Sequence, residues 1–431
     1  MRITAATAFL LTTTLVACQP ATEQPSTAAD DTTARPADAA VESWSLPVQG
    51  DAAQPDLVAT PDGDLLLSWI SPDEDGHVLS FARHRDGQWS APHAIARGDD
   101  WFVNWADTPH ILATDDGAVW AHWLQKSAAS TYAYDVALVR SADGGASWSA
   151  PVLVNDDGTP TEHGFVSLWP AGRDRLGIAW LDGRESAGAS HDSHDDAPAG
   201  HAPADAPAMT LRTAVFDPVL ARSGETRIDA MTCDCCQTDT AVTAHGPLLV
   251  YRDRSAAEIR DIAATRFQDG RWTEPAPVHA DGWTMPACPV NGPAVDAVGD
   301  AVLVGWYTAA NDEPSLRLAR SDDAGDHFSA PLELDRGAHV QGRVDVVLAG
   351  RSAWALWTRE DGAGQSLQLA RLAPDLSAEW QRFELARLQG RGRGTGFAQL
   401  AMGADGTLHV VWTDVVNGAP RLHGARIRLA G

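Results

Sequence analysis

One short apolar segment occurs seven times in this chain of 431 residues, and every copy ends in an aromatic residue. The copies run from Leu65 to Trp69, Val119 to Trp123, Leu176 to Trp180, Leu248 to Tyr251, Val302 to Trp306, Ala353 to Trp357 and Leu408 to Trp412. Another apolar segment precedes each copy and a third follows it. Many short strands at even spacing, with turn residues between them, predict an all-β barrel, sandwich or propeller.

A fourth segment in each unit distinguishes these folds. It recurs as Trp89-Ser-Ala-Pro, Trp148-Ser-Ala-Pro, Trp272-Thr-Glu-Pro and Phe328-Ser-Ala-Pro, with looser versions near Thr226 and Trp380. The seventh unit lacks this segment, whereas Trp44-Ser-Leu-Pro stands alone at the start of the folded region. We therefore predict a β-propeller of seven blades, with six as the alternative, in which an N-terminal strand completes the last blade and closes the ring.

The N-terminus has the pattern of an export signal. Residues 1–17 carry one positive charge, a short apolar run and small residues, and the run is too short to cross a bilayer. Leu15-Val-Ala-Cys18 resembles the bacterial lipobox, which implies that Cys18 becomes the acylated first residue. Residues 18–40 have almost nothing to bury and are expected to form a disordered tether. We predict an exported lipoprotein with a propeller over 41–431, held in the outer membrane where there is one.

The formal net charge of −26 limits the partners of the folded region. Nucleic acids and anionic membrane surfaces require clustered cations, so neither is expected as a partner. The membrane contact is therefore expected through the lipid at Cys18.

Two turns share the pattern Ser-x-Asp-x-Gly-x-x-aromatic. They contain Ser141, Asp143, Gly145 and Trp148 in one unit, and Ser321, Asp323, Gly325 and Phe328 in another. The aspartate can accept backbone N–H bonds within its own turn, and glycine permits a positive φ. On these turns the folded region resembles the sialidase superfamily of Asp-box propellers. The resemblance implies that the boxes join the third and fourth strands, opposite the active face, and are structural.

Members of that superfamily that cleave sialic acid clamp its carboxylate with three arginines and use a tyrosine nucleophile, its glutamate partner and an aspartate. The first arginine of the family is absent, because the comparable segment reads Gln54-Pro-Asp-Leu. Arg343, Tyr251 and Arg252 are weak catalytic candidates, and no glutamate partner is identifiable. An exo-sialidase activity is therefore not favoured, and whether the protein is an enzyme stays open.

Polar residues cluster where the first strands of the blades begin, around the expected central mouth. They are Asp56, Asn104, Asp107, His163, Asn291, Arg343, Arg393 and Gln399. Convergent polar groups at such a mouth predict a ligand site. We expect it to recognise a glycan or another small anionic ligand, and hydrolysis of that ligand stays open. A non-catalytic scaffold for a protein partner is the simplest alternative.

Four cysteines besides Cys18 form the most unusual feature of the chain. Cys233, Cys235 and Cys236 precede one blade and Cys288 precedes the next, so the repeat predicts that they gather at the mouth. Disulfides are natural in an exported protein, and one bridge to Cys288 with two spare thiols avoids strained bonds between near neighbours. A thiolate site for copper(I) or zinc is the alternative. The sequence favours a disulfide over a metal.

The loop between Arg184 and Met209 adds His191, His194 and His201. Short His-rich segments can bind metal, and this loop is expected on the same face as the cysteines. Its Ala, Pro, Asp and Gly content slightly favours a disordered surface insertion.

Overall fold

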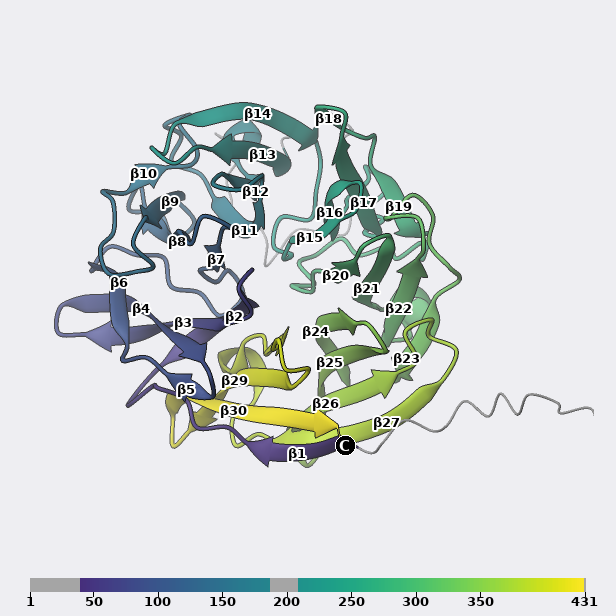
Figure 1. The fold of residues 1–431 in the computed structure, drawn as a ribbon. Helices are drawn as coiled ribbons and strands as arrows, with labels where there is room; N and C mark the ends of the chain where they lie inside the picture. Colours follow the sequence, from purple (N-terminus) through teal and green to yellow (C-terminus); the bar gives the residue numbers. More distant parts are fainter. Residues whose placement is uncertain (1–38, 187–207, 430–431) are drawn as a thin grey trace, which may run out of the picture. The chain divides into compact units, whose positions relative to one another are not determined.

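A computed structural model describes residues 39–186 and 208–429 and shows seven antiparallel sheets arranged around an axis (Figure 1). Blade 1 contains β2 (Ala53–Ala59), β3 (Leu65–Asp73), β4 (Gly76–Arg85), β5 (Gln88–Trp89) and β6 (His93–Gly98), and blade 2 contains β7 (Ile111–Ala113), β8 (Val119–Lys126), β9 (Tyr134–Ser141) and β10 (Val152–Leu153). Blade 3 contains β11 (His163–Pro170), β12 (Leu176–Asp182), β13 (Thr210–Phe216) and β14 (Arg222–Asp229). In blades 1 to 6 the first-numbered strand is the innermost, and in blade 7 the innermost strand is β28 (Gln399–Met402).

The remaining blades repeat this order. Blade 4 contains β15 (Asp239–Thr243), β16 (Gly246–Arg252), β17 (Ile262–Gln268), β18 (Arg271–Trp272) and β19 (Ala276–His279), and blade 5 contains β20 (Ala294–Val298), β21 (Ala301–Thr308), β22 (Ser315–Ser321) and β23 (Leu332–Arg336). Blade 6 contains β24 (Val340–Ala349), β25 (Ser352–Asp361), β26 (Gly364–Leu372) and β27 (Glu379–Arg387). The predicted count of seven blades is confirmed, and the alternative of six is wrong.

The ends of the chain meet in blade 7, as predicted. This blade contains β28 (Gln399–Met402), β29 (Leu408–Val416) and β30 (Ala419–Leu429), and β1 (Ala39–Ser43) pairs antiparallel with β30 as its outer strand (Figure 1). The Trp44 N–H then donates to the Gly424 carbonyl at 2.9 Å. The closing strand begins at Ala39, slightly before the boundary expected at residue 41. Closure leaves the last blade with a full set of strands, because the missing outer strand comes from the start of the chain.

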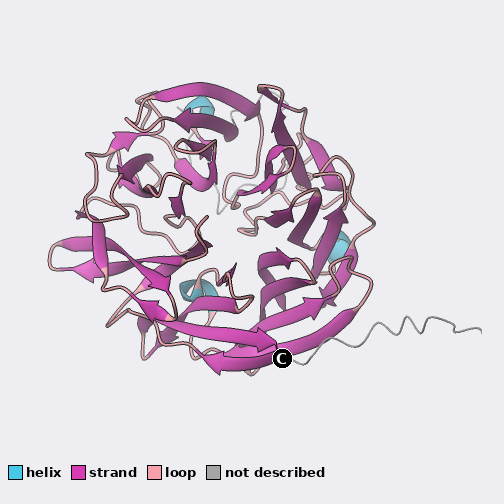
Figure 2. Ribbon diagram, viewed as in Figure 1, coloured by secondary structure: helices cyan, strands magenta, loops and turns pink. Residues whose placement is uncertain are grey.

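Strands account for almost all regular structure (Figure 2). Within the described ranges the helical segments are three short 3₁₀ turns, η1 (Arg184–Ser186), η3 (Ala310–Asp312) and η4 (Gly392–Thr395). None of the described helices is long and apolar enough to span a membrane.

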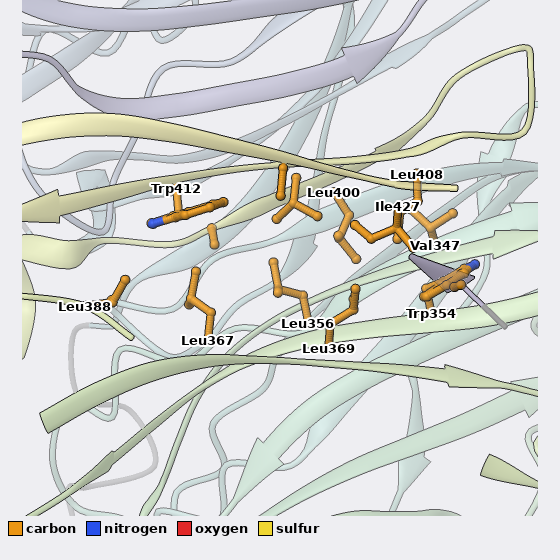
Figure 3. Packing of buried hydrophobic residues seen from close by; sticks show 14 residues of the cluster. Val347, Trp354, Leu356, Leu367, Leu369, Leu388, Leu400, Leu408, Trp412 and Ile427 are labelled. Atoms are coloured by element: carbon orange, nitrogen blue, oxygen red, sulfur yellow. The ribbon is translucent and has the colours of Figure 1, made fainter. Parts of the chain in front are cut away.

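The aromatic residue at the repeated position is buried in every blade. Trp180, Trp306 and Trp357 are fully enclosed, and Trp412, the least buried, is 9% exposed. These rings pack with alternating Leu, Val and Ile side chains of neighbouring sheets; Figure 3 shows such a cluster between blades 6 and 7, with Trp354, Leu356 and Trp412 among its members. Period-two alternation places these residues on the faces where blades contact each other.

Each Asp-box turn is held by its own side chains. In blade 2 the Ser141 hydroxyl donates to Asp143 Oδ1 at 2.7 Å and accepts the Gly145 N–H at 2.7 Å, while Ser147 N–H donates to Asp143 Oδ1 at 2.8 Å. The turn joins β9 to β10, and Trp148 packs edge-on against Phe81 of blade 1. The second box, at Ser321 and Asp323, repeats the pattern. The boxes therefore serve local turn geometry and blade packing.

Candidate functional site at the central mouth

A central cavity of about 630 Å³ runs between the inner strands. Its wall includes Asp56, His110, Gln237, Phe397 and Gln399. The loops that lead into the inner strands surround one end of it. They include 99–110, 230–238, 280–293 and 388–398. The loop 253–261 lies on the same side because it joins a second to a third strand. This end of the cavity is the mouth.

Aspartates on the inner strands connect neighbouring blades around the axis. Each carboxylate accepts a backbone N–H from the inner strand of the next blade, which satisfies a donor that has no partner in its own sheet. The N–H to Oδ distances are 2.7 Å for Ile111 to Asp56, 2.7 Å for Val295 to Asp239, 2.8 Å for Leu348 to Asp296 and 2.6 Å for Leu400 to Asp345. Asp56 was expected to face a ligand. In the structure it is buried, and its carboxylate accepts the Ile111 N–H of the next blade.

These carboxyl groups make the cavity acidic. Burial raises the pKa of Asp239 to about 7 and that of Asp296 to about 6, against the effect of the N–H bonds that favour the charged form. Burial likewise raises the pKa of Asp345 well above its ordinary value. The carboxylates that remain ionised near neutral pH, Asp239 and Asp296, disfavour an anionic ligand inside the cavity.

Two arginines named as weak catalytic candidates, Arg343 and Arg252, donate to backbone carbonyls. Arg343 is 7% exposed and donates to the Gly392 and Gly396 carbonyls and to the Thr395 hydroxyl, which fixes η4. Burial lowers the pKa of Arg343 to about 10. Arg252 is 2% exposed and donates to three carbonyls from three different segments. Neither guanidinium is directed at the cavity as a carboxylate clamp.

Two aromatic rings lie at the mouth. Trp105, from the loop before blade 2, stacks on Phe397, from the loop before blade 7, with centroids 5.8 Å apart and planes inclined by 17°. Both side chains are half-buried, and Phe397 lines the cavity. Arg343 lies 4.9 Å from the Trp105 centroid, and the exposed Arg393 lies 5.9 Å from it. The sequence did not single out this pair because its two rings come from loops at opposite ends of the chain.

The structure brings together a tyrosine, a glutamate and an aspartate that sequence analysis did not pair. The Tyr134 hydroxyl lies 2.6 Å from Glu162 Oε1 and 3.2 Å from Asp107 Oδ2, and Asp107 Oδ1 accepts the Phe165 N–H at 2.7 Å. Burial raises the pKa of Asp107 to about 7 and that of Glu162 to about 8. Their positions at the junction of blades 2 and 3 follow from the strand order.

Tyr134 is fully buried and stacks on Phe102 at 4.1 Å, so its hydroxyl has no open path to a substrate. Tyr251, one of the weak candidates, is also buried and donates to Asp229 Oδ2 at 2.6 Å. A nucleophile must reach its substrate, so we assign hydrolysis to neither residue.

His163, expected at the mouth, is instead enclosed among charges. Its Nε2 lies 3.1 Å from Asp157 Oδ2 and 3.7 Å from Asp182 Oδ1, and Arg184 Nη2 lies 2.7 Å from Asp182. Burial works against the imidazolium, but the two carboxylates raise the pKa of His163 overall. The three acceptor groups are close enough for a metal ion. The Arg184 guanidinium already supplies positive charge next to Asp182. We therefore interpret these residues as a buried ion network.

The other mouth residues hold loops together. Asn104 Oδ1 accepts the Ala106 N–H at 2.9 Å, and Asn291 Oδ1 accepts the Arg343 N–H at 2.8 Å. Gln237 donates to the Ala106 carbonyl and accepts the Gly292 N–H, and so links three loops around the mouth. Gln399 is half-buried and lines the cavity.

The four cysteines do gather beside this mouth. Cys235 and Cys288 form a disulfide, whereas Cys233 and Cys236 are thiols that are each 1% exposed. The sulfurs of Cys233, Cys235 and Cys236 lie within 4.8 Å of one another. Copper(I) or zinc would find two thiols here, and the third and fourth ligands would require reduction of the disulfide.

Positive charge surrounds the buried thiols. Arg260 Nη1 lies 3.3 Å from Cys233 Sγ, and Glu258 holds Arg260 at 2.9 Å. Burial disfavours the thiolate, but the Cys236 thiol and the guanidinium groups of Arg260 and Arg252 lower the pKa of Cys233 to about 7. Burial and the neighbouring Cys233 raise the pKa of Cys236 well above its ordinary value. The thiolate therefore forms more readily on Cys233 than on Cys236.

Two predicted features fall outside the described residues. They are the lipidation site at Cys18 and the histidine loop with His191, His194 and His201.

Comparisons with known proteins show the fold. No protein-family model matches the chain, and a search of curated proteins gives no match. Among solved structures, a protein of unknown function from Dyadobacter fermentans is 14% identical, with 88% of this chain and 95% of that chain covered and a TM-score of 0.50. The intramolecular trans-sialidase of Ruminococcus gnavus is 12% identical over 88% and 96% of the chains, with a TM-score of 0.46. The α-L-arabinanase of Penicillium chrysogenum is 14% identical over 89% and 94%, also with 0.46. At these identities the likenesses concern the fold alone, and the seven blades follow from the sheet order of this chain.

Proposed function

We propose that this protein is a lipid-anchored envelope protein that binds a glycan at the mouth of its propeller without hydrolysing it. The observation that carries the proposal is the half-exposed stack of Trp105 on Phe397 at the end of a cavity of about 630 Å³. Cavities of roughly 300 to 1,000 Å³ suit small ligands, and aromatic faces pack against the C–H groups of sugar rings.

Charge favours a neutral sugar over a sialic acid. Arg343 and Arg252 donate to backbone carbonyls, so they do not present a carboxylate clamp. Asp239 and Asp296 line the cavity, and their ionised forms would repel a carboxylate. Hydroxyl groups of a neutral sugar can instead donate to these carboxylates and pair with the amide of Gln399.

A glycan array with matched neutral and sialylated members tests the proposal on the purified full chain. We expect binding to neutral glycans, and we expect Trp105→Ala to weaken it about tenfold, which corresponds to about 1.4 kcal/mol. Phe267→Ala is the matched control, because Phe267 is an exposed ring at the end of β17, on the face opposite the mouth. Binding confined to sialylated glycans, or equal loss in both variants, would contradict the proposal.

The membrane anchor is tested separately. Growth with an alkyne fatty acid should label the wild-type chain and leave Cys18→Ser unlabelled and released from the membrane fraction. Label on Cys18→Ser would show that the lipid is attached elsewhere.

A further inference from the structure

The cysteine cluster contains a dithiol next to a disulfide. Cys233 and Cys236 form a Cys-x-x-Cys motif. Cys235, which is bonded to Cys288, is one of the two residues between them. Cys233 Sγ lies 4.0 Å from Cys235 Sγ. The proposed glycan site does not involve the two buried thiols, so glycan binding does not explain the cysteine cluster.

The two sulfur pairs differ in access to solvent. Cys233 and Cys236 are each 1% exposed, whereas Cys288 is exposed and Cys235 is half-buried. The exposed Cys288 lies in the loop 280–293 at the rim of the mouth. A compound in solution can therefore reach Cys288 but cannot reach the buried pair directly.

We propose that the four cysteines form a thiol–disulfide exchange centre in which the disulfide migrates between Cys235–Cys288 and Cys233–Cys236. The geometry behind the proposal is the 4.0 Å separation of Cys233 Sγ from the bonded Cys235 Sγ and the Arg260 guanidinium at 3.3 Å, which stabilises a Cys233 thiolate.

The exchange balances without an external oxidant or reductant. The Cys233 thiolate attacks Cys235 Sγ, the Cys233–Cys235 bond forms, and the bond to Cys288 breaks with Cys288 leaving as a thiolate. Cys236 then attacks Cys233 Sγ, the Cys233–Cys236 bond forms, and Cys235 leaves. The two protons of the original dithiol end on Cys235 and Cys288.

The product presents an accessible dithiol at the mouth. Cys235 and Cys288 can then reduce a disulfide in a second molecule, giving two external thiols and restoring the Cys235–Cys288 bond. The substrate class is therefore a disulfide compound or a protein disulfide that can reach Cys288. This inference is independent of glycan binding.

Alkylation under native conditions tests the migration in the full chain. The protein is incubated with saturating iodoacetamide, quenched in acid, denatured, treated with N-ethylmaleimide and mapped by peptide mass spectrometry without reduction. We expect acetamide on Cys235 and Cys288 together with a Cys233–Cys236 disulfide; peptide mapping separates Cys18 from this set. At saturating reagent the exchange limits the rate, which should rise about tenfold per pH unit below pH 7 and level off above it, as the Cys233 thiolate forms.

Arg260, Arg252, Arg254, Glu258 and Asp234 are the charged groups around this thiol, and Cys236 is its titrating neighbour. The pH profile is therefore read as that of the Cys233 thiol in the presence of these groups.

Two variants separate exchange from local opening. Cys233→Ser should reduce labelling of Cys288 at least about tenfold, since the nucleophile is lost. Cys236→Ser keeps the nucleophile but removes the final partner, so Cys288 alone should be labelled and Cys233 should be found bonded to Cys235. This labelling pattern decides the question even where Cys233→Ser folds poorly.

Three results would overturn the proposal. The first is acetamide on Cys233 or Cys236 while the Cys235–Cys288 bond is intact. The second is an unlabelled Cys288 in the wild type until the protein unfolds. The third is stoichiometric copper or zinc that must be removed before any of the four cysteines reacts, which would make the cluster a metal site.

Discussion

Replacing Asp107 by asparagine should make the fold less sensitive to alkaline pH. Asp107 is 2% exposed, and burial raises its pKa to about 7. In the unfolded chain an aspartate titrates near 3.9. The folded state therefore holds a proton between these values that the unfolded state has lost. Stability from this group is present below about pH 4 and is lost as the pH rises to about 7.

The expected size follows from the two pKa values. Between pH 5 and pH 8 the folded protein should lose about 2.5 kcal/mol through this carboxyl, by the linkage relation. Asparagine carries no such proton. Its carbonyl can still accept the Phe165 N–H, and its amide can donate to the Tyr134 hydroxyl, which donates to Glu162. Removal of the neighbouring charge should also lower the pKa of Glu162.

The assay is guanidinium chloride unfolding of both proteins at pH 5 and pH 8. We expect the difference between the two pH values to be smaller in the Asp107→Asn variant than in the wild type by at least about 2.5 kcal/mol. Asp75→Asn is the control, because Asp75 is exposed on the turn between β3 and β4. Parallel pH dependences for wild type and Asp107→Asn would refute the argument that burial raises the pKa of this carboxyl to about 7.

Three further substitutions test other parts of the structure. Ser141→Ala leaves the Gly145 N–H of the Asp box without its acceptor and should cost about 1 to 2 kcal/mol in denaturant unfolding, with glycan binding unchanged. Gly164→Ala places a Cβ 2.0 Å from Asp107 Oδ2 and should cost more than about 2 kcal/mol; a melting temperature equal to that of the wild type would exclude this close approach. Arg343→Met removes the donors that hold η4 and should weaken neutral-glycan binding about tenfold in titration calorimetry, whereas unchanged affinity would show that η4 does not position Phe397.

The sequence by itself determined the architecture. Strand segments ending in Trp69, Trp180 and Trp306 recur at even spacing, and such a repeat has few ways to bury its apolar side chains. The unpaired segment at Trp44 predicted the closure of the ring. The Asp boxes were also legible, because Ser141 and Asp143 bond within a single turn. All of these features depend on residues that are close in the chain or repeated along it.

Only the tertiary structure decided the character of the mouth. Arg343 and His163 were correctly placed near the starts of inner strands. The sequence could not show that the Arg343 guanidinium donates to backbone carbonyls, or that carboxylates surround the His163 ring. The pairing of Trp105 with Phe397 joins loops from opposite ends of the chain. Likewise, the repeat predicted that the four cysteines lie close together, but only the three-dimensional packing places the buried Cys233 thiol 4.0 Å from Cys235 Sγ. The physical reason is that charge, burial and reactivity depend on neighbours through space, whereas a repeat specifies only where each strand begins.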